Sequence, residues 1–183
     1  WKMTNAIESW SWNGCDGKRT KVEVYARASR IDLFINDGLV GTKRPKNDCR
    51  VVFKVKYYAG EIKADSYDAT DKVLAETIYT NAGNETKLTL APENTKGELL
   101  YVRLQYTDDA GKIKPLVRGD IKVKVQGGKL LGLGNACPYN ERGYLTDITD
   151  TYYGEALAII QPFEESVQVY AESPFGQEQI ILE

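Results

Sequence analysis

The sequence has no histidine among its 183 residues. Without an imidazole, the chain can form neither a Ser-His-Asp triad nor a Cys-His pair, and it lacks a common nitrogen ligand of protein-bound metals. The glycine-rich loops that bind phosphate groups and the nucleophile elbow of hydrolases are also missing from the sequence. We therefore predict no catalytic residue, no metal site and no cofactor in this chain.

Cysteine is scarce as well, with only Cys15, Cys49 and Cys137 in the chain. An odd number leaves at least one thiol unpaired within the chain, and the wide spacing contains no Cys-x-x-Cys pair. We therefore expect neither a disulfide framework nor a cysteine zinc site.

Long hydrophobic runs and an excess of positive charge are absent too. No stretch of apolar residues is long enough to span a bilayer, and no basic leader precedes an apolar segment. The formal net charge of −2 argues against a nucleic acid held through its phosphates. We expect neither a membrane nor a nucleic acid as a partner. Because the sequence opens at Trp1 without an initiator methionine, we expect it to be a piece of a longer polypeptide.

The most informative pattern in the chain is the alternation of apolar and polar residues. In residues 20–41, apolar side chains recur at every second position in two successive segments. A period of two places one face of a strand in a core and the other in water. The run Asn-Asp-Gly at 36–38 tolerates positive φ and predicts a tight turn into a short return strand at 39–41. Antiparallel strands with one apolar face need a second sheet over them, which favours a β-sandwich.

Segments of the same kind continue through the chain and divide at a small polar stretch, residues 81–84. Further strands are expected at 50–57, 61–67, 72–80, 86–90, 99–107, 121–126, 156–160, 167–171 and 179–182. Short strands at this spacing are typical of immunoglobulin-like sandwiches. The predicted fold class is all-β, with two tandem immunoglobulin-like antiparallel β-sandwiches formed by residues 1–82 and 83–183.

Two indoles, Trp10 and Trp12, lie two residues apart in the lead-in segment 1–17, before the first strand. This spacing puts both on the same side of an extended chain. Three interpretations are open: the indoles cover the edge of a core, dock on a partner, or stack on a sugar ring. Covering a core edge is the simplest, and we favour docking over sugar stacking for at least one of them.

The segment 127–153 is long for a sandwich loop and rich in glycine, asparagine and tyrosine. Long loops without secondary structure of their own are usually binding elements or disordered, and the tyrosines argue against disorder. The candidates for binding carbohydrate or docking on a partner in this loop are Tyr139, Tyr144, Tyr152 and Tyr153.

Acidic residues in the same loop raise the question of a glycosidase-type pair or a calcium site. Glu141, Asp147 and Asp150 are the residues concerned. Glycoside hydrolysis needs two carboxyl groups at a defined separation, and calcium needs several oxygen ligands around one point. Carboxylates in the loops of a sandwich are usually solvated, and no spacing rule selects a pair or a cluster here. We predict that none of them is catalytic or binds a metal.

Several motifs resemble a domain that follows the catalytic barrel in enzymes of glycoside hydrolase family two. In the first half the resemblance is carried by residues 10–18 (WSWNGCDGK), 22–25 (VEVY) and 33–36 (LFIN). In the second half, residues 131–138 (LGLGNACP) and 154–160 (GEALAII) are similar to the immunoglobulin-like or invasin-like domain that comes next in those enzymes. The resemblance extends over essentially the whole chain.

Three positions depart from the family pattern. Ser9 stands where a histidine is common, Asp37 intervenes in a turn that is usually Asn-Gly, and Cys137 replaces an acidic residue before the loop proline. The last change argues against a polar or metal role of that loop. The family's acid/base glutamate follows an asparagine on the barrel, whereas Asn84-Glu85 and Asn140-Glu141 follow no barrel strand and are chance matches.

The resemblance implies a bacterial glycosidase parent, β-galactosidase-like and exported to the periplasm or the cell exterior. Its active site would lie on a barrel outside this fragment. The fragment is then expected to be non-catalytic, to pack on the barrel of the same parent chain and to support it. Two alternatives stay open: an autonomous carbohydrate-binding module, and a pair of surface-adhesin domains that space other parts.

Overall fold

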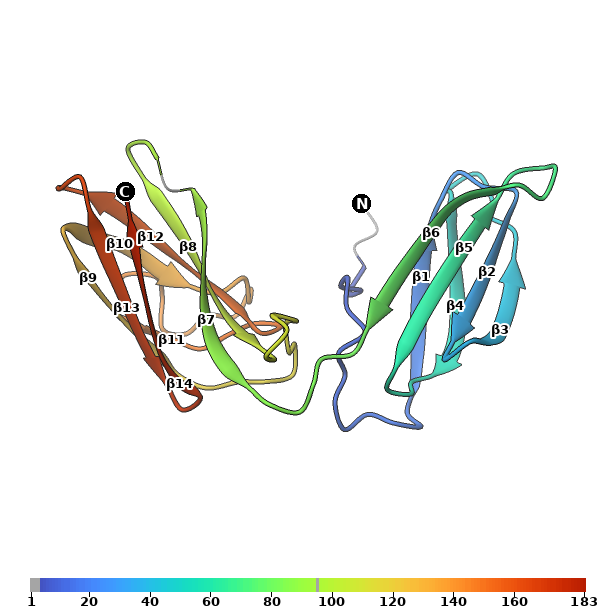
Figure 1. Cartoon of the computed structure of the whole chain (residues 1–183), viewed down its shortest axis with the longest axis horizontal. Helices are drawn as coiled ribbons and strands as arrows, with labels where there is room; N and C mark the ends of the chain where they lie inside the picture. The colour runs from blue at the N-terminus through green and yellow to red at the C-terminus, as the bar shows by residue number, and fades with distance from the viewer. Residues whose placement is uncertain (1–3, 95) are drawn as a thin grey trace. The chain divides into compact units, whose positions relative to one another are not determined.

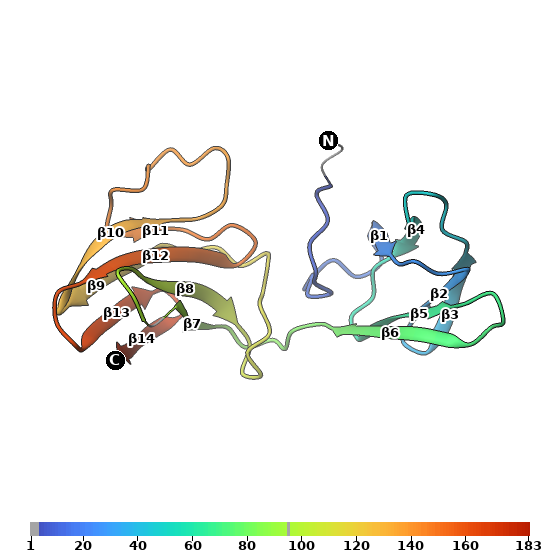
Figure 2. The ribbon, with the colours of Figure 1, turned by 90° about the horizontal axis from the view of Figure 1, so that it is seen from above.

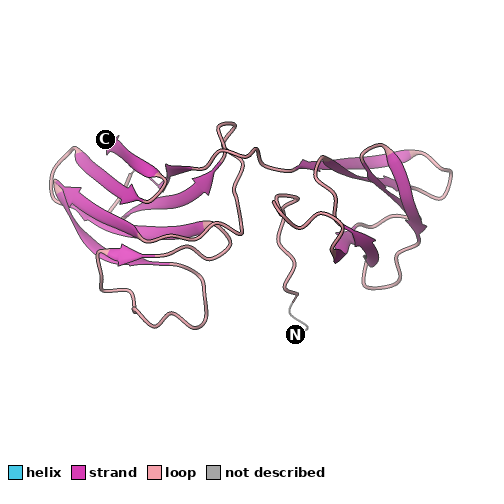
Figure 3. Cartoon of the chain, turned by 90° about the horizontal axis from the view of Figure 1, so that it is seen from below, coloured by secondary structure: helices cyan, strands magenta, loops and turns pink. Residues whose placement is uncertain are grey.

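The computed structural model describes residues 4–94 and 96–183, so the first three residues of the lead-in lie outside the described residues. Within that part of the chain all regular secondary structure consists of β-strands (Figure 1; Figure 3), which confirms the predicted all-β fold class. None of the described residues belongs to a helix long and apolar enough to cross a bilayer. The chain divides into two compact units, Trp1–Asn81 and Ala82–Glu183.

The first unit is a sandwich of a two-stranded and a four-stranded antiparallel sheet. The smaller sheet pairs β1 (Arg19–Tyr25) with β4 (Arg50–Lys56). The larger sheet has the order β3 (Gly38–Lys43), β2 (Arg30–Ile35), β5 (Glu61–Tyr67), β6 (Val73–Thr80). Alternate residues of the paired strands meet in the core, as their period predicts: Ile31, Leu33, Ile35, Val51, Phe53 and Ile62.

The predicted turn after β2 is present, and one side chain fixes it. Asn36 and Asp37 both have positive φ, 48° and 64°, so β2 returns directly as β3. The Asn36 amide donates to the Ala59 carbonyl at 2.9 Å and accepts from the Glu61 N–H at 2.8 Å, which ties this turn to the one between β4 and β5. Gly60 lies under this amide at a φ of 121°, where a Cβ atom would come 2.0 Å from Asn36 Oδ1. Only glycine fits at that position.

The second unit is a sandwich of two four-stranded antiparallel sheets. One has the order β10 (Gly128–Gly134), β12 (Glu155–Pro162), β8 (Leu100–Thr107), β7 (Lys87–Asn94). The other has the order β11 (Ile148–Thr149), β9 (Ile121–Gln126), β13 (Val167–Ser173), β14 (Gly176–Leu182). Their inner faces form one core, which includes Val102, Leu104, Ile121, Leu133, Ile160 and Val169.

The segment 127–153 is not the continuous loop that its composition predicts. Its first part is β10, which pairs with β12 and buries Leu133, and a later part is the short strand β11 beside β9. One of the glycines that suggest a loop, Gly128, permits close approach between two strands instead. A Cβ atom on Gly128 would lie 2.8 Å from the Gln161 carbonyl oxygen of β12. The loop that remains between these strands is residues 135–147.

Two buried charged side chains hold the first residues of the second unit. Asp108 accepts the Gly83 N–H at 2.7 Å. Lys114 Nζ donates to the carbonyl oxygens of Asn84 and Glu85, each at 2.7 Å, although the residue is only 5% exposed. The small polar stretch between the two sets of strands is therefore bonded to the body of the second unit over residues 83–85.

Candidate functional site

The two lead-in tryptophans occupy different environments in the first unit. Trp10 is buried, with 3% of its surface exposed, and its ring packs on that of Tyr57 with the centroids 4.8 Å apart. Its Nε1 donates to the Tyr58 carbonyl oxygen at 3.1 Å. Trp12 is only partly buried against the same core. Trp10 therefore covers the edge of the core and offers no free face to a sugar or a partner, whereas Trp12 keeps part of its indole at the surface.

A groove of about 610 Å³ opens between β1 and β6 of the first unit. Leu33 and Ile62 of the larger sheet line it, together with Trp12 of the lead-in and Tyr79 of β6. The larger sheet has four strands and the smaller sheet has two, so the smaller sheet cannot cover the whole inner face of the larger one. The groove is the part of that face which stays open.

Strand β6 borders this groove and is exposed along almost its whole length. It is an edge strand that pairs only with β5 within its sheet. Four of its large hydrophobic side chains are exposed: Val73, Leu74, Ile78 and Tyr79. A long apolar edge strand beside an open groove is typical of a surface that another protein segment covers.

Glu23 of β1 anchors the lead-in at the rim of the groove. Its carboxylate accepts hydrogen bonds from Arg50 Nη2 at 2.7 Å, from the Tyr25 hydroxyl at 2.6 Å and from the Thr4 hydroxyl at 3.0 Å. The bonds from Arg50 and Tyr25 are the main reason that the pKa of Glu23 falls from 4.5 to about 2. The ionised carboxylate thus joins β1, β4 and the lead-in.

Replacing Glu23 with glutamine should destabilise the first unit at neutral pH by about 1–3 kcal/mol, because charge-assisted hydrogen bonds are lost. The pKa of the folded state lies below that of the unfolded state, so this contribution is complete above about pH 4.5 and is lost as the pH falls through about 2. The wild type and the Glu23→Gln variant should therefore converge in stability as the medium becomes acidic.

Urea unfolding followed by tryptophan fluorescence measures this effect in the first unit alone, because all three tryptophans, Trp1, Trp10 and Trp12, lie there. A stability gap that stayed constant between pH 7 and pH 2.5 would contradict the role given to the carboxylate charge. Glu61→Gln serves as the control, because no hydrogen bond or ion pair of the Glu61 side chain contributes to this network.

The second candidate region is the loop 135–147 at one end of the second unit. Figure 2 shows this loop extending away from the two sheets where it connects β10 to β11. Tyr139 is 87% exposed, and Tyr144 and Leu145 are also exposed. Tyr144 lies against the backbone of β10, since a Cβ atom on Gly134 would come 2.5 Å from its ring. Tyr139 is therefore the loop tyrosine that is most free to meet a ligand.

Tyr152 and Tyr153 follow β11 and are both partly buried. Their ring centroids lie 4.5 Å apart. The hydrogen bond with Tyr153 is the main cause that raises the pKa of the Tyr152 hydroxyl. The two rings are thus in contact with each other, and Tyr152 also lines the hollow described below.

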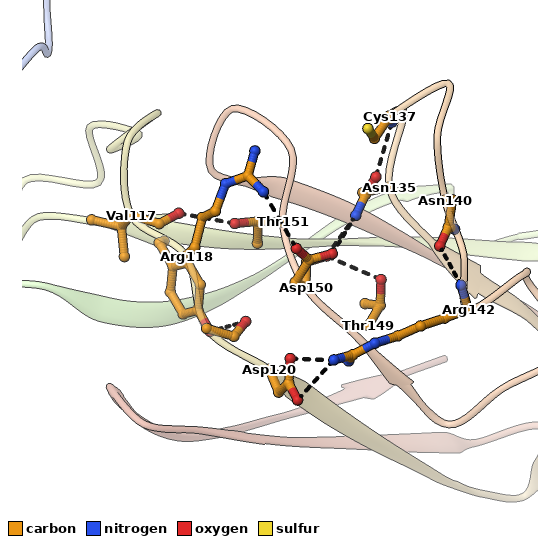
Figure 4. A network of polar contacts seen from close by, with 12 residues as sticks. Val117, Arg118, Asp120, Asn135, Cys137, Asn140, Arg142, Thr149, Asp150 and Thr151 are labelled. Carbon is orange, nitrogen blue, oxygen red and sulfur yellow. Dashed lines mark hydrogen bonds and ion pairs between the residues drawn. The ribbon is translucent and has the colours of Figure 1, made fainter.

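Asp150 is the centre of a polar network beside the loop, drawn in Figure 4. Its Oδ1 accepts from Asn135 Nδ2 at 2.7 Å, and its Oδ2 lies 3.8 Å from Arg118 Nη1. Asn135 in turn accepts the N–H of Cys137 at 2.9 Å, which fixes the start of the loop. Farther along the loop, Arg142 pairs with Asp120 through two contacts of 2.9 and 3.2 Å. These bonds hold the loop against the end of the sandwich.

A hollow of about 210 Å³ lies between this network and the loop. Among the residues that line it are Arg118, Tyr139, Glu141, Arg142, Asp150 and Tyr152. Two of the four loop tyrosines named from the sequence, Tyr139 and Tyr152, are thus brought to one site. Trp10 and Trp12 belong to the other unit and do not contribute to it.

Sequence reasoning missed the polar partners of this hollow. Arg118 lies in the segment before β9, far from the loop along the chain, and nothing in the local pattern around it indicates a site. Asn135 is part of a glycine-rich motif, and its role follows only from the bonds it makes. Cys137, whose place before the loop proline argues against a polar role of the loop, itself lines the polar hollow.

Of the three carboxylates considered from the sequence, Glu141 and Asp150 line the hollow, whereas Asp147 is not among its lining residues. Asp147 forms a surface ion pair with Lys122 at 3.8 Å, and Glu141 lies on an exposed turn of the loop. Asp150 accepts a hydrogen bond from Asn135 and forms a longer ion pair of 3.8 Å with Arg118. In the described residues, no group of three or more histidine, cysteine or acidic side chains is arranged to hold a metal ion.

Each of the two units matches a different family model. Residues 90–180 match the family model described as Glycoside hydrolase family 2 C-terminal domain 5. Residues 17–75 match a domain of unknown function, DUF4982. No curated protein matches the sequence.

Solved structures share the fold over nearly the whole chain. A glycoside hydrolase family 2 member from Bacteroides cellulosilyticus is 23% identical with a TM-score of 0.87, over 97% of this chain and 26% of that chain. A β-glycosidase from Bacteroides vulgatus is 22% identical with a TM-score of 0.80, over 97% of this chain and 24% of that chain. A β-glucuronidase from glycoside hydrolase family 2 is 21% identical with a TM-score of 0.81, over 95% of this chain and 19% of that chain.

This chain therefore spans about a quarter of the length of these enzymes, or less. At such identities the likeness to each structure shows the fold alone. The family model covers residues 90–180 of the second unit and makes that unit similar to a C-terminal domain of glycoside hydrolase family 2. The fold of the whole chain is similar to that of the corresponding part of these enzymes.

Proposed function

We propose that the chain is the non-catalytic C-terminal β-sandwich region of an exported bacterial family-2 glycosidase with β-galactosidase-like specificity. Its role is to pack on the catalytic barrel of the same parent chain and to support it. The proposal rests on the difference between the share of this chain and the share of a family-2 enzyme that match each other. Nearly all of this chain, 97%, matches about a quarter of a larger family-2 enzyme, and its second unit matches a C-terminal domain of that family.

The first unit provides a surface suited to this packing. The open groove and the exposed β6 leave apolar area uncovered, and the lead-in that precedes β1 lines the same groove. Covering apolar surface stabilises an interface by about 25 cal/mol per Å² removed from water. A spacer between other domains would have no use for such a surface, which favours the packing role over the adhesin alternative.

The surroundings of the two carboxylates at the hollow agree with a non-catalytic role. A retaining glycosidase holds its two carboxyl groups about 5–5.5 Å apart, with one acting as the nucleophile and the other as the acid/base. In this chain Asp150 is bonded to Asn135, and Glu141 lies on an exposed turn of a loop. We expect no turnover of nitrophenyl β-galactoside or β-glucuronide by the isolated chain, and turnover abolished by Glu141→Gln would overturn this expectation.

The test of packing uses the coding sequence upstream of Trp1. If a (β/α)8 barrel is encoded there, that barrel expressed as a separate chain should co-purify with residues 1–183 and unfold at a higher temperature in their presence. The Tyr79→Lys substitution on β6 should weaken this association by about tenfold or more, because it removes an exposed aromatic ring at the groove and adds a charge that the interface would bury. Val40→Lys on the opposite sheet edge, a similarly exposed hydrophobic position, is the matched control and should have little effect.

Two results would contradict the proposal. One is an upstream sequence that encodes no barrel, and the other is a barrel whose stability and activity do not respond to this chain. Specificity is read from the assembled enzyme by comparing nitrophenyl β-galactoside with nitrophenyl β-glucuronide. Faster turnover of the glucuronide would replace the galactosidase-like assignment while leaving the packing role intact. Cell fractionation of the parent tests export.

A further inference from the structure

We infer that the hollow between the loop 135–147 and the Asp150 network binds one neutral sugar ring of a glycan. This site lies wholly within the second unit, and the inference does not depend on packing against a barrel. It rests on the size of the hollow, the polar groups that line it, their summed charge and the exposed ring of Tyr139.

The hollow is small and open. Its volume of about 210 Å³ is below the range of roughly 300–1,000 Å³ that is usual for drug-sized ligands. A single six-membered sugar ring suits such a volume, and the remainder of a glycan can continue into solvent through the open side. A larger planar cofactor would not be enclosed here.

Arg118 and Asp150 supply a donor and an acceptor side by side. The distance of 3.8 Å between Arg118 Nη1 and Asp150 Oδ2 exceeds that of a hydrogen bond, so these two atoms do not satisfy each other. The Arg118 side chain is 66% exposed, while Asn135 holds the Asp150 carboxylate in place. Neighbouring hydroxyl groups of a sugar, each able to donate and accept, match such a pair.

The charges around the hollow cancel. Arg118 and Arg142 are balanced by Glu141 and Asp150, all four of which line it. A site for a phosphate, a sulfate or a uronic acid would carry an excess of positive charge. The balanced set favours an uncharged ligand that needs both donors and acceptors.

Tyr139 adds an aromatic face. Tyr139 lines the hollow and is 87% exposed, so its ring can cover the apolar C–H face of a sugar without any rearrangement of the core. Leaving a ring so exposed in the absence of a ligand has no benefit for stability. An aromatic face next to several hydrogen-bond donors and acceptors is the combination that recognises carbohydrate.

The experiment is a titration of the ¹⁵N-labelled chain, residues 1–183, followed by amide chemical shifts. The probes are methyl β-D-galactopyranoside and methyl β-D-glucopyranoside, with methyl β-D-glucuronide as the anionic comparison. We expect at least one neutral glycoside to shift the amides around Arg118, Tyr139 and Asp150, with a Kd of about 1 mM. Tyr139→Ala and Arg118→Ala should each raise this Kd by about tenfold or more.

The two variants replace exposed side chains, so the fold is expected to persist, and unchanged amide spectra elsewhere would verify this. The matched controls are Phe163→Ala, an exposed aromatic of the same unit, and Arg44→Ala, an exposed arginine of the other unit; neither should change the Kd. Three results would each overturn the inference: no shift with either neutral glycoside, shifts confined to the first unit, or binding of the glucuronide alone.

Discussion

Replacing Trp10 with alanine is expected to destabilise the first unit by about 3–5 kcal/mol. The indole is almost fully buried, its ring packs on Tyr57, and its Nε1 bonds to the Tyr58 carbonyl. The substitution removes the apolar contacts, leaves a cavity, and deprives a carbonyl oxygen of its partner. A loss of this size is a large share of the stability of a small domain.

Urea unfolding of the Trp10→Ala variant can be followed through the fluorescence of the remaining tryptophans, both of which lie in the first unit. Trp12→Ala is the comparison, and because Trp12 is only partly buried its replacement should cost clearly less in the isolated chain. Should Trp10→Ala cost less than about 1 kcal/mol, the indole would not be part of the core.

If the proposed barrel is added to the isolated chain, the two tryptophans should differ further. Replacing a core residue destabilises the domain equally with or without a barrel, and we expect this result for Trp10→Ala. Replacing a residue that docks on a partner lowers the stability of the assembly more than that of the isolated chain. We expect this result for Trp12→Ala, because Trp12 lines the open groove. The docking hypothesis formed from the sequence thus stays a prediction for Trp12.

Replacing Lys114 with methionine is expected to destabilise the second unit by about 2–3 kcal/mol. Methionine keeps most of the side-chain volume but cannot donate to the carbonyl oxygens of Asn84 and Glu85, each now bonded at 2.7 Å. The two charge-assisted bonds are lost, and the gain from no longer burying an ammonium group offsets only part of that loss. Asn84 and Glu85 should then detach from the body of the unit, whereas Gly83 stays bonded to Asp108.

Calorimetry measures the loss of stability, and limited proteolysis measures the detachment. In the wild type the loop 135–147 should be cleaved before residues 83–85, whereas the Lys114→Met variant should become sensitive at 83–85. Lys129→Met, an exposed lysine of the same unit, should change neither measurement. Unaltered protection of 83–85 in the Lys114→Met variant would show that other contacts hold this segment.

Most strands could be predicted because their signal is local. Residues 121–126 alternate strictly, and the structure has β9 at Ile121–Gln126 with Ile121 and Val123 buried. A period of two in apolar residues reports which face is buried, whatever the partner strand is. The turn at Asn36–Gly38 was equally readable, because its residues are those that tolerate positive φ.

Strand β10 could not be predicted, because its composition is that of a loop. Gly128 is required by close approach to β12, and Gly134 by close approach to the ring of Tyr144 in the following loop. The first residue of β12 is more than twenty positions away from the last residue of β10. Local propensity carries no information about such a neighbour. The same limit applies to β6, whose residues read as a strand but whose exposure depends on how far the facing sheet extends.

The sequence by itself determined the all-β class, the two sets of strands and some residues of the candidate sites, among them Trp12 and Tyr139, because each depends on side-chain type and short-range period. Only the tertiary structure decided which of these residues share a site. It buried Trp10 but left Trp12 at a groove, and it joined Tyr139 and Tyr152 to Arg118 and Asp150. The reason is physical: a binding site is made by contacts between strands and loops that are distant along the chain, and only packing brings them together.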